Sequence, residues 1–107
     1  MLAEFSICPL GKVNLSKDIA KVVEVLENCD VKYSLGPLGT CLEGTLEQIL
    51  TAIRRCHEAI ARDNERVVTH IKLDDRRNDA HSLTGMVKAV EKQLGRQTFG
   101  GGVDAER

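Results

Sequence analysis

The residues best suited to chemistry are one carboxylate, several hydroxyls and a few ionisable side chains, all in strand-like segments. Glu43 lies near the end of the segment YSLGPLGTCLEGT, residues 33–45, two residues before the expected start of a helix. An ionised carboxylate offers only acceptor oxygens, so Glu43 suits a cation or a group with two donors. Its other possible role is a negative charge near a helix start, which contributes about 0.3–1 kcal/mol. The residues alone leave both roles open.

Nucleophilic catalysis is the competing chemistry. Cys8 or Cys41 with His70 would make a nucleophile and a base if the fold brought them within hydrogen-bond reach. The sequence contains no Gly-rich phosphate loop, nucleophile elbow or zinc motif. None of the four cysteines stands in a C-x-x-C pair, which favours free thiols that pack as small hydrophobes. We expect no catalytic residue, no metal site and no cofactor.

Hydrophobic periodicity places these residues on strands and helices. Apolar and polar residues alternate along 3–8, 31–35, 40–43 and 66–74, as in half-buried strands. Helical spacing predicts one helix from Asn14 or Ser16 to about residue 28, a second capped by Thr45 with Gln48, and a third around residues 83–94. The Gly-Pro-Leu-Gly run at 36–39 predicts a tight hairpin turn. The expected inner stripe of the second helix comprises Leu46, Ile49, Leu50, Ile53, His57 and Ile60.

The order of these elements predicts the fold. Strand-helix-strand-strand-helix-strand is the split βαβ pattern of the ferredoxin-like fold, an α+β class, here with a C-terminal helix added. Right-handed crossovers place strands one and three at the centre of an antiparallel sheet, with both main helices on one face. We expect a single domain over residues 1–97 and a loose tail over 98–107, because three consecutive glycines follow the last helix.

The sheet face opposite the helices has a mixed composition. Small, apolar and ionisable side chains share it, which favours packing against a second sheet with polar groups enclosed. We therefore expect self-association, and the aromatic content of 3% makes additional burial in an oligomer more favourable. Ser6, Cys8 and Glu43 are expected to be close neighbours there. The residues predicted on this face are Ser6, Cys8, Ser34, Cys41, Glu43, Val68, His70 and Lys72.

Composition argues against two kinds of partner. The formal net charge is −1 with both signs interspersed, so no basic field attracts nucleic acid or an anionic membrane. No segment approaches the run of about 20 apolar residues that a membrane-spanning helix needs, and the N-terminal segment lacks the pattern of a secretory signal. We expect a cytoplasmic protein that binds neither nucleic acid nor membrane.

Three segments carry a family resemblance: FSICPLG, YSLGPLGTCLEGT and RVVTHIKLDDR, in this order. As an ordered set they resemble the small thiamine-binding protein family of the YkoF-like superfamily, across most of the chain. The resemblance implies a ferredoxin-like protomer that forms homodimers or homotetramers and binds thiamine or its hydroxymethylpyrimidine portion without catalysis. It favours the ligand role of Glu43 over the helix-start role, and it suggests Arg76 and Asp79 as subunit contacts.

An aminopyrimidine suits this set of residues. Its exocyclic amine and, when protonated, its ring nitrogen can donate two hydrogen bonds to a carboxylate such as Glu43, and the thiazolium of thiamine adds a positive charge. Thr40 points opposite to Glu43 by strict alternation, so its participation requires a bulge or a turn position. Lys72 would attract a phosphate but repel a thiazolium. Besides Glu43, the candidate ligand contacts are the hydroxyls of Ser6, Ser34 and Thr40, the backbone at Gly36 and, for a phosphorylated or purely pyrimidine ligand, Lys72.

The alternative to metabolite binding of this kind is an interaction module. In that reading, the polar sheet face recognises a different metabolite or another protein, and the module has a regulatory role.

Overall fold

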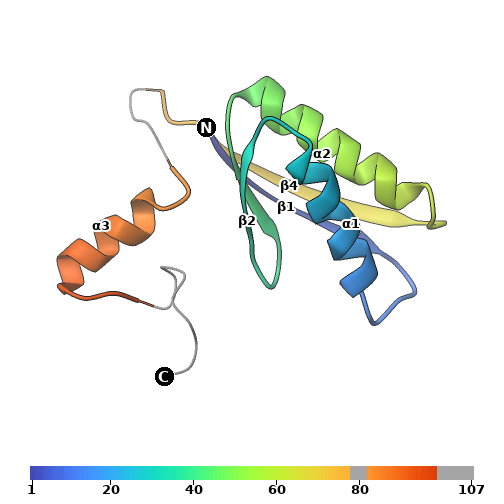
Figure 1. Cartoon of the computed structure of the whole chain (residues 1–107), viewed down its shortest axis with the longest axis horizontal. Helices are drawn as coiled ribbons and strands as arrows, with labels where there is room; N and C mark the ends of the chain where they lie inside the picture. Colours follow the sequence, from blue (N-terminus) through green and yellow to red (C-terminus); the bar gives the residue numbers. More distant parts are fainter. Residues whose placement is uncertain (78–81, 99–107) are drawn as a thin grey trace.

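The structure, a computed structural model, describes residues 1–77 and 82–98. Asp79 and the tail from residue 99 onward lie outside the described residues. The described part contains the expected succession of strands and helices (Figure 1). In chain order these are β1 (Leu2–Pro9), α1 (Ser16–Glu27), β2 (Lys32–Leu35), β3 (Thr40–Glu43), α2 (Leu46–Ala61), β4 (Val67–Asp74) and α3 (Gly85–Leu94).

The four strands form one antiparallel sheet in the order β2-β3-β1-β4. β1 and β3 occupy the centre, as predicted, and α1 and α2 cover the same face of the sheet (Figure 1). The α+β, ferredoxin-like prediction is therefore confirmed.

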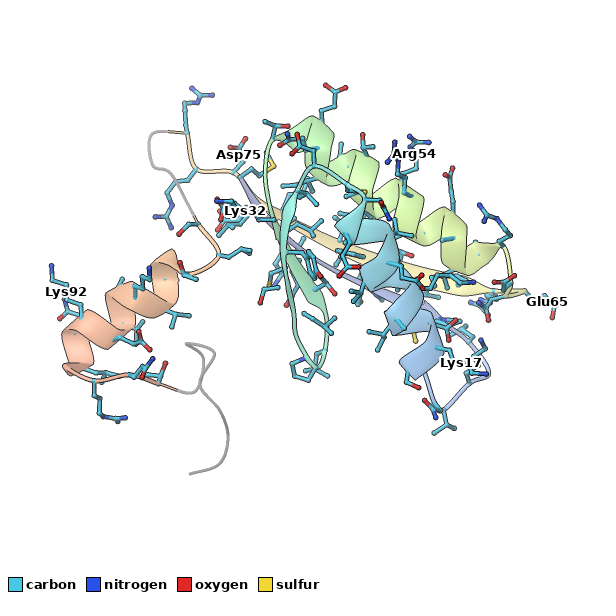
Figure 2. All side chains as sticks on the ribbon, in the orientation of Figure 1. Lys17, Lys32, Arg54, Glu65, Asp75 and Lys92 are labelled. Carbon is cyan, nitrogen blue, oxygen red and sulfur yellow. The ribbon has the colours of Figure 1, made fainter. Side chains whose placement is uncertain are left out.

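The hydrophobic core lies between the sheet and the two covering helices. Phe5 and Leu42 from the sheet meet Leu26 of α1 and Ile49 and Ile60 of α2, and all five side chains are buried. Charged side chains such as those labelled in Figure 2 lie on the outer surface. This segregation follows from the helical and strand periods of the apolar residues.

The inner stripe predicted for α2 is partly wrong. Leu46 and Leu50 are 46% and 43% exposed, whereas Ala52, Cys56 and Ala59 are buried. The core-facing stripe is thus rotated toward small residues, which allow α2 to pack closely against its neighbours. His57 of α2 is half-buried, and its Nδ1 lies 2.6 Å from the hydroxyl oxygen of Thr69 on β4.

The two covering helices begin differently. The capping box of α2 is confirmed, because the Gln48 amide donates to the Thr45 hydroxyl at 3.1 Å and the Thr45 amide donates to Gln48 Oε1 at 2.9 Å. For α1 the predicted cap is wrong by one position. Its N-cap is Leu15, which has no side-chain oxygen, and Asn14 Oδ1 instead accepts from the Ser16 amide at 3.0 Å.

α3 lies apart from the two-layer domain (Figure 1). None of its residues is buried, and Met86, Val90 and Leu94 are exposed on it. The apolar side chains at helical spacing therefore have no core partner within the described part of the chain.

A mismatch in strand length opens space beside β1. β1 pairs with β4 from Leu2 to Pro9, but it pairs with β3 only from Leu2 to Phe5. The last four residues of β1 consequently have a neighbouring strand on the β4 side alone. The β2–β3 hairpin turns beyond the last pair of β3 with β1, and in this turn the Gly36 amide donates to the Gly39 carbonyl at 2.9 Å. Gly36 is required there, because a Cβ atom would meet that carbonyl oxygen at 2.9 Å.

Candidate ligand-binding site

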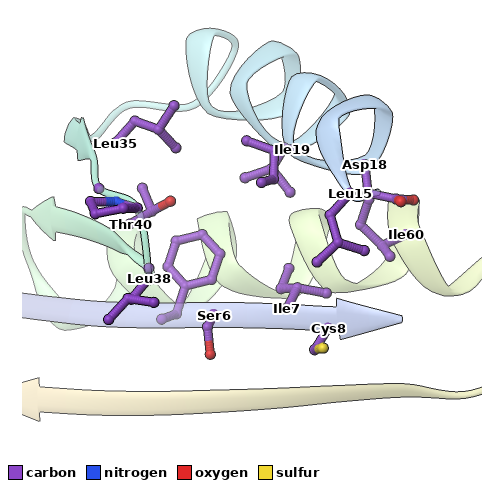
Figure 3. A pocket seen from close by; sticks show the side chains of 15 residues that line it. Ser6, Ile7, Cys8, Leu15, Asp18, Ile19, Leu35, Leu38, Thr40 and Ile60 are labelled. Carbon is purple, nitrogen blue, oxygen red and sulfur yellow. The ribbon is translucent and has the colours of Figure 1, made fainter. Parts of the chain in front are cut away.

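A cavity of about 290 Å³ lies where the β2–β3 hairpin ends, between the hairpin loop, α1 and the unpaired end of β1 (Figure 3). Its size is close to the lower end of the range for small-molecule sites, about 300–1,000 Å³. Most of its walls are apolar, which suits a flat organic ligand. The main apolar side chains are Phe5, Ile7, Leu15, Ile19, Val22, Leu35, Leu38 and Ile60.

Thr40 places a polar group in this apolar cavity. It is the first residue of β3 and is 5% exposed. Its hydroxyl is directed into the cavity (Figure 3) and has no hydrogen-bond partner among residues 1–77 and 82–98. Leaving such a buried group unsatisfied costs about 1–3 kcal/mol. Alternation already turns Thr40 toward the helices, so its place in the cavity needs no bulge.

Asp18 on α1 forms one end of the cavity, beside Leu15 and Ile60 (Figure 3). Its side chain is 11% exposed, and its two carboxylate oxygens lie 3.3 and 3.4 Å from Lys12 Nζ. A nearly buried carboxylate requires such a partner. Sequence reasoning missed Asp18, although it lies three residues after Leu15 and four before Val22, inside the apolar face of α1.

The predicted ligand contacts fall into three groups. Ser6, Gly36 and Thr40 line the cavity. Ser6 also lines a second space of about 240 Å³, the side hollow, which it shares with Lys72 and His70; its hydroxyl points away from α1 in Figure 3. Ser34 and Glu43 line neither space. The structure therefore brings together three of the six candidate residues in one cavity.

Glu43 already has protein partners at the other end of β3. Its Oε1 accepts a hydrogen bond from the Leu83 amide at 2.8 Å, and its Oε2 lies 4.0 Å from Lys32 Nζ. Glu43 pairs with Leu2 across the sheet, whereas Ser6 pairs with His70. Glu43 and Ser6 are thus separated by four residue steps along β1, about 13 Å. The expectation that Ser6, Cys8 and Glu43 are close neighbours is wrong.

The open face of the sheet, opposite the helices, carries cross-strand polar pairs. Glu4 is opposite Lys72, and Lys32 is opposite Glu43. No hydrogen bond connects His70 to a cysteine in the described ranges. Burial, reinforced by the Glu4 carboxylate, raises the pKa of the Cys41 thiol, which disfavours the thiolate that a nucleophile requires.

The described residues contain neither a membrane-spanning helix nor a metal-binding cluster. No helix in them is both long enough and apolar enough to cross a bilayer. No group of three or more His, Cys, Asp or Glu side chains in them is arranged to hold a metal ion.

The fold and the cavity define a small ferredoxin-like domain with a candidate small-molecule site. The chain belongs to the family described as Thiamine-binding protein, whose sequence model matches residues 3–91. The UPF0045 protein MJ1052 of Methanocaldococcus jannaschii is 37% identical over 91 residues, covering 84% of this chain and 91% of the relative. A UPF0045 protein of Methanothermobacter thermautotrophicus is 34% identical, covering 86% of this chain and 97% of the relative.

Solved structures agree with this assignment. The crystal structure of the hypothetical protein MJ1052 has a TM-score of 0.79 at 37% identity, covering 85% of this chain and 95% of that protein. A Thermotoga maritima protein, solved as a candidate thiamine biosynthesis/salvage protein, has a TM-score of 0.72 at 18% identity, covering 83% of this chain and 96% of that one. At that identity the second likeness shows the fold alone.

Proposed function

We propose that this protein binds thiamine or its hydroxymethylpyrimidine portion, without chemistry on it, in the cavity between α1 and the hairpin. The observation that carries the proposal is the buried Thr40 hydroxyl, which is directed into an apolar cavity and has no hydrogen-bond partner among the described residues. A ligand with a polar ring atom would satisfy this hydroxyl and bury its own ring against the apolar walls. The family description supports the choice of ligand.

The cavity matches thiamine in two further respects. Phe5 provides an aromatic ring in the wall, and aromatic pairs add about 0.5–1.5 kcal/mol beyond the area that they bury. Asp18 places a carboxylate at the α1 end, and its negative charge, although partly offset by Lys12, favours the positively charged thiazolium. A neutral pyrimidine needs only the Thr40 end. We therefore propose that the pyrimidine ring of either ligand lies at the Thr40 end of the cavity.

Self-association through the open face is part of the proposal. The Glu4–Lys72 and Lys32–Glu43 pairs can face their counterparts in a second copy, which supports a homodimer or homotetramer. We place the protein in the cytoplasm, because all four cysteines are free thiols, which persist in reducing compartments.

Titration calorimetry with thiamine and with hydroxymethylpyrimidine tests the binding. Thr40→Val keeps the shape of the side chain and removes the hydroxyl, so we expect affinity to fall about 3- to 10-fold, the value of one hydrogen bond. Ser34→Ala is the matched control, because it removes a hydroxyl that does not line the cavity. If neither compound binds the native protein at millimolar concentration, the proposal is wrong.

A protein-interaction module is the second candidate function. The exposed Met86, Val90 and Leu94 on α3 favour it, since they lie on one helix face without a core partner in the described structure. Replacing all three by Ser should leave ligand affinity unchanged if binding is confined to the cavity. A loss of partner or subunit association in the same variant would support the interaction role.

A further inference from the structure

The unpaired end of β1 directs main-chain hydrogen-bonding groups into the cavity. The Gly44 amide donates to the Met1 carbonyl at 3.1 Å, so the main chain of residue 1 faces the β3 side. The N–H and C=O groups of a strand residue in an antiparallel sheet face the same side, and successive residues alternate. Residues 3, 5 and 7 therefore also face β3. The Leu10 amide, which donates to the Arg66 carbonyl next to β4, agrees with this alternation.

The main chain of Ile7 faces the β3 side but has no strand partner there. The last pair between β1 and β3 is Phe5 with Thr40, so the N–H and C=O of Ile7 face the place where β3 has ended. Ile7 is half-buried and lines the cavity, and no hydrogen bond joins its main chain to the loop at residues 36–39. The cost of an unpaired main-chain donor and acceptor rises with their burial, so a ligand that pairs with both groups would be favoured. The Thr40 hydroxyl lies in the same cavity.

We propose that the N–H and C=O of Ile7 recognise the aminopyrimidine edge of the ligand, in place of the missing β3 residue. This inference rests on the proposed function and specifies the atoms that the ligand contacts. The exocyclic amine donates to the Ile7 carbonyl, and the adjacent ring nitrogen accepts from the Ile7 amide. The ring then continues the sheet, with Ile19 of α1 above it and the Thr40 hydroxyl at its edge.

This arrangement predicts selectivity for an adjacent donor and acceptor on the ring. An analogue of hydroxymethylpyrimidine in which hydrogen replaces the amine would lose one of the two main-chain bonds. We expect its affinity to be about 3- to 10-fold lower, the value of one hydrogen bond. Equal affinity for the two compounds would overturn the inference.

Amide hydrogen exchange measured by NMR tests the contact without a mutation. In the ligand-free full-length protein, the Ile7 amide should exchange at least tenfold faster than that of Phe5, which faces its β3 partner Thr40. Saturating hydroxymethylpyrimidine should slow the Ile7 amide at least tenfold and leave Phe5 unchanged. Binding without protection at Ile7 overturns the inference alone, and absence of binding overturns both it and the proposed function. Concentration-dependent protection without ligand would assign the edge to a second copy of the chain and also overturn the inference.

A substitution pair provides an independent measurement. Ile7→Pro removes the amide hydrogen at a position where no strand partner uses it, so the sheet should persist by circular dichroism. Ile7→Val retains the amide and serves as the control. We expect the Pro variant to bind hydroxymethylpyrimidine at least about threefold more weakly than the Val variant. Equal affinity of two folded variants contradicts the contact, and if the Pro variant does not fold, the exchange experiment decides.

Discussion

The two faces of the sheet hold their polar groups in opposite ways. On the helix-covered face, Thr40 is almost completely buried and its hydroxyl has no partner in the described ranges. On the open face, Glu43 is more exposed, at 23% for its side chain, and is bonded to the Leu83 amide. Because an unsatisfied buried group is costly and a partnered carboxylate is not, the hydroxyl is the better indicator of a ligand. The charge of Glu43 and its place in a distinctive motif favour it as a ligand contact. The lack of a hydrogen-bond partner for the buried hydroxyl in the described ranges favours Thr40 instead.

The largest expected difference between the faces concerns packing. Leu42 and Cys41 are neighbours on β3, but Leu42 is fully buried under the helices and Cys41 lies on the open face. Leu42→Ala should lower the free energy of unfolding by about 2–5 kcal/mol, and Cys41→Ala by less than about 1 kcal/mol. Urea denaturation measures both. Similar losses would show that the open face is buried in solution, as it would be in a tight oligomer.

Substitutions of Thr40 and Glu43 should change the free energy of unfolding in opposite directions. Thr40→Val should raise the free energy of unfolding of the ligand-free protein by about 1–3 kcal/mol, because an apolar methyl replaces an unsatisfied hydroxyl. Glu43→Ala should lower it by about 1 kcal/mol through loss of the bond to the Leu83 amide. Both are read from urea denaturation.

Ligand affinity then decides between the two residues. The ligand role of Glu43 stays a prediction, and Glu43→Gln tests it. If that variant loses affinity and Thr40→Val does not, the site belongs to the open face.

Alkaline pH should affect the covered face through Cys56. Burial, with a smaller contribution from Cys29, raises the pKa of the Cys56 thiol to about 12. The stability linked to this thiol is fully present below its unfolded-state pKa, about 8.5, and is lost as pH rises toward the folded-state value. Between pH 9 and 12 the free energy of unfolding should fall by about 1.4 kcal/mol per pH unit more in the native protein than in Cys56→Ala. Parallel pH profiles would contradict this assignment.

The smallest expected effect is on the open face. The cross-strand pair of Glu4 and Lys72 should contribute about 0.2–1 kcal/mol in a double-mutant cycle with Glu4→Gln and Lys72→Met. The coupling should fade in 1 M salt if the pair is exposed to solvent, because screening then acts over about 3 Å. A larger coupling that resists salt would indicate that a second copy covers this face.

The fold was predictable because alternation and helical spacing are strong along most of the chain. The α2 stripe was not, since Ala52 and Cys56 carry little hydrophobic signal although both are fully buried. Leu46 and Leu50 have a stronger apolar character but lie on the exposed side of the helix, although their neighbour Ile49 is fully buried. Helix rotation therefore follows close packing of small residues rather than the largest apolar side chains.

The site was only partly predictable. Thr40 was a candidate contact from its residue type, but the cavity depends on where the pairing of β3 with β1 stops, and strand register is a property of the assembled sheet. The bond between Glu43 and Leu83 joins residues 40 positions apart, so no local pattern encodes it. Asp18 was the one recoverable omission, since an acid within an apolar helical face is visible in the sequence.

The unequal lengths of β1 and β3 have a further consequence for how such a site can be lost or regained. Two additional residues in each strand of the hairpin would bring the main chain of β3 opposite Ile7, and the protein would fill its own binding site. Ligand binding in this fold could then disappear through a short insertion that changes none of the contacting residues. The length of the hairpin would thus determine during evolution whether the binding site is open, and removing the insertion would restore the site in one step.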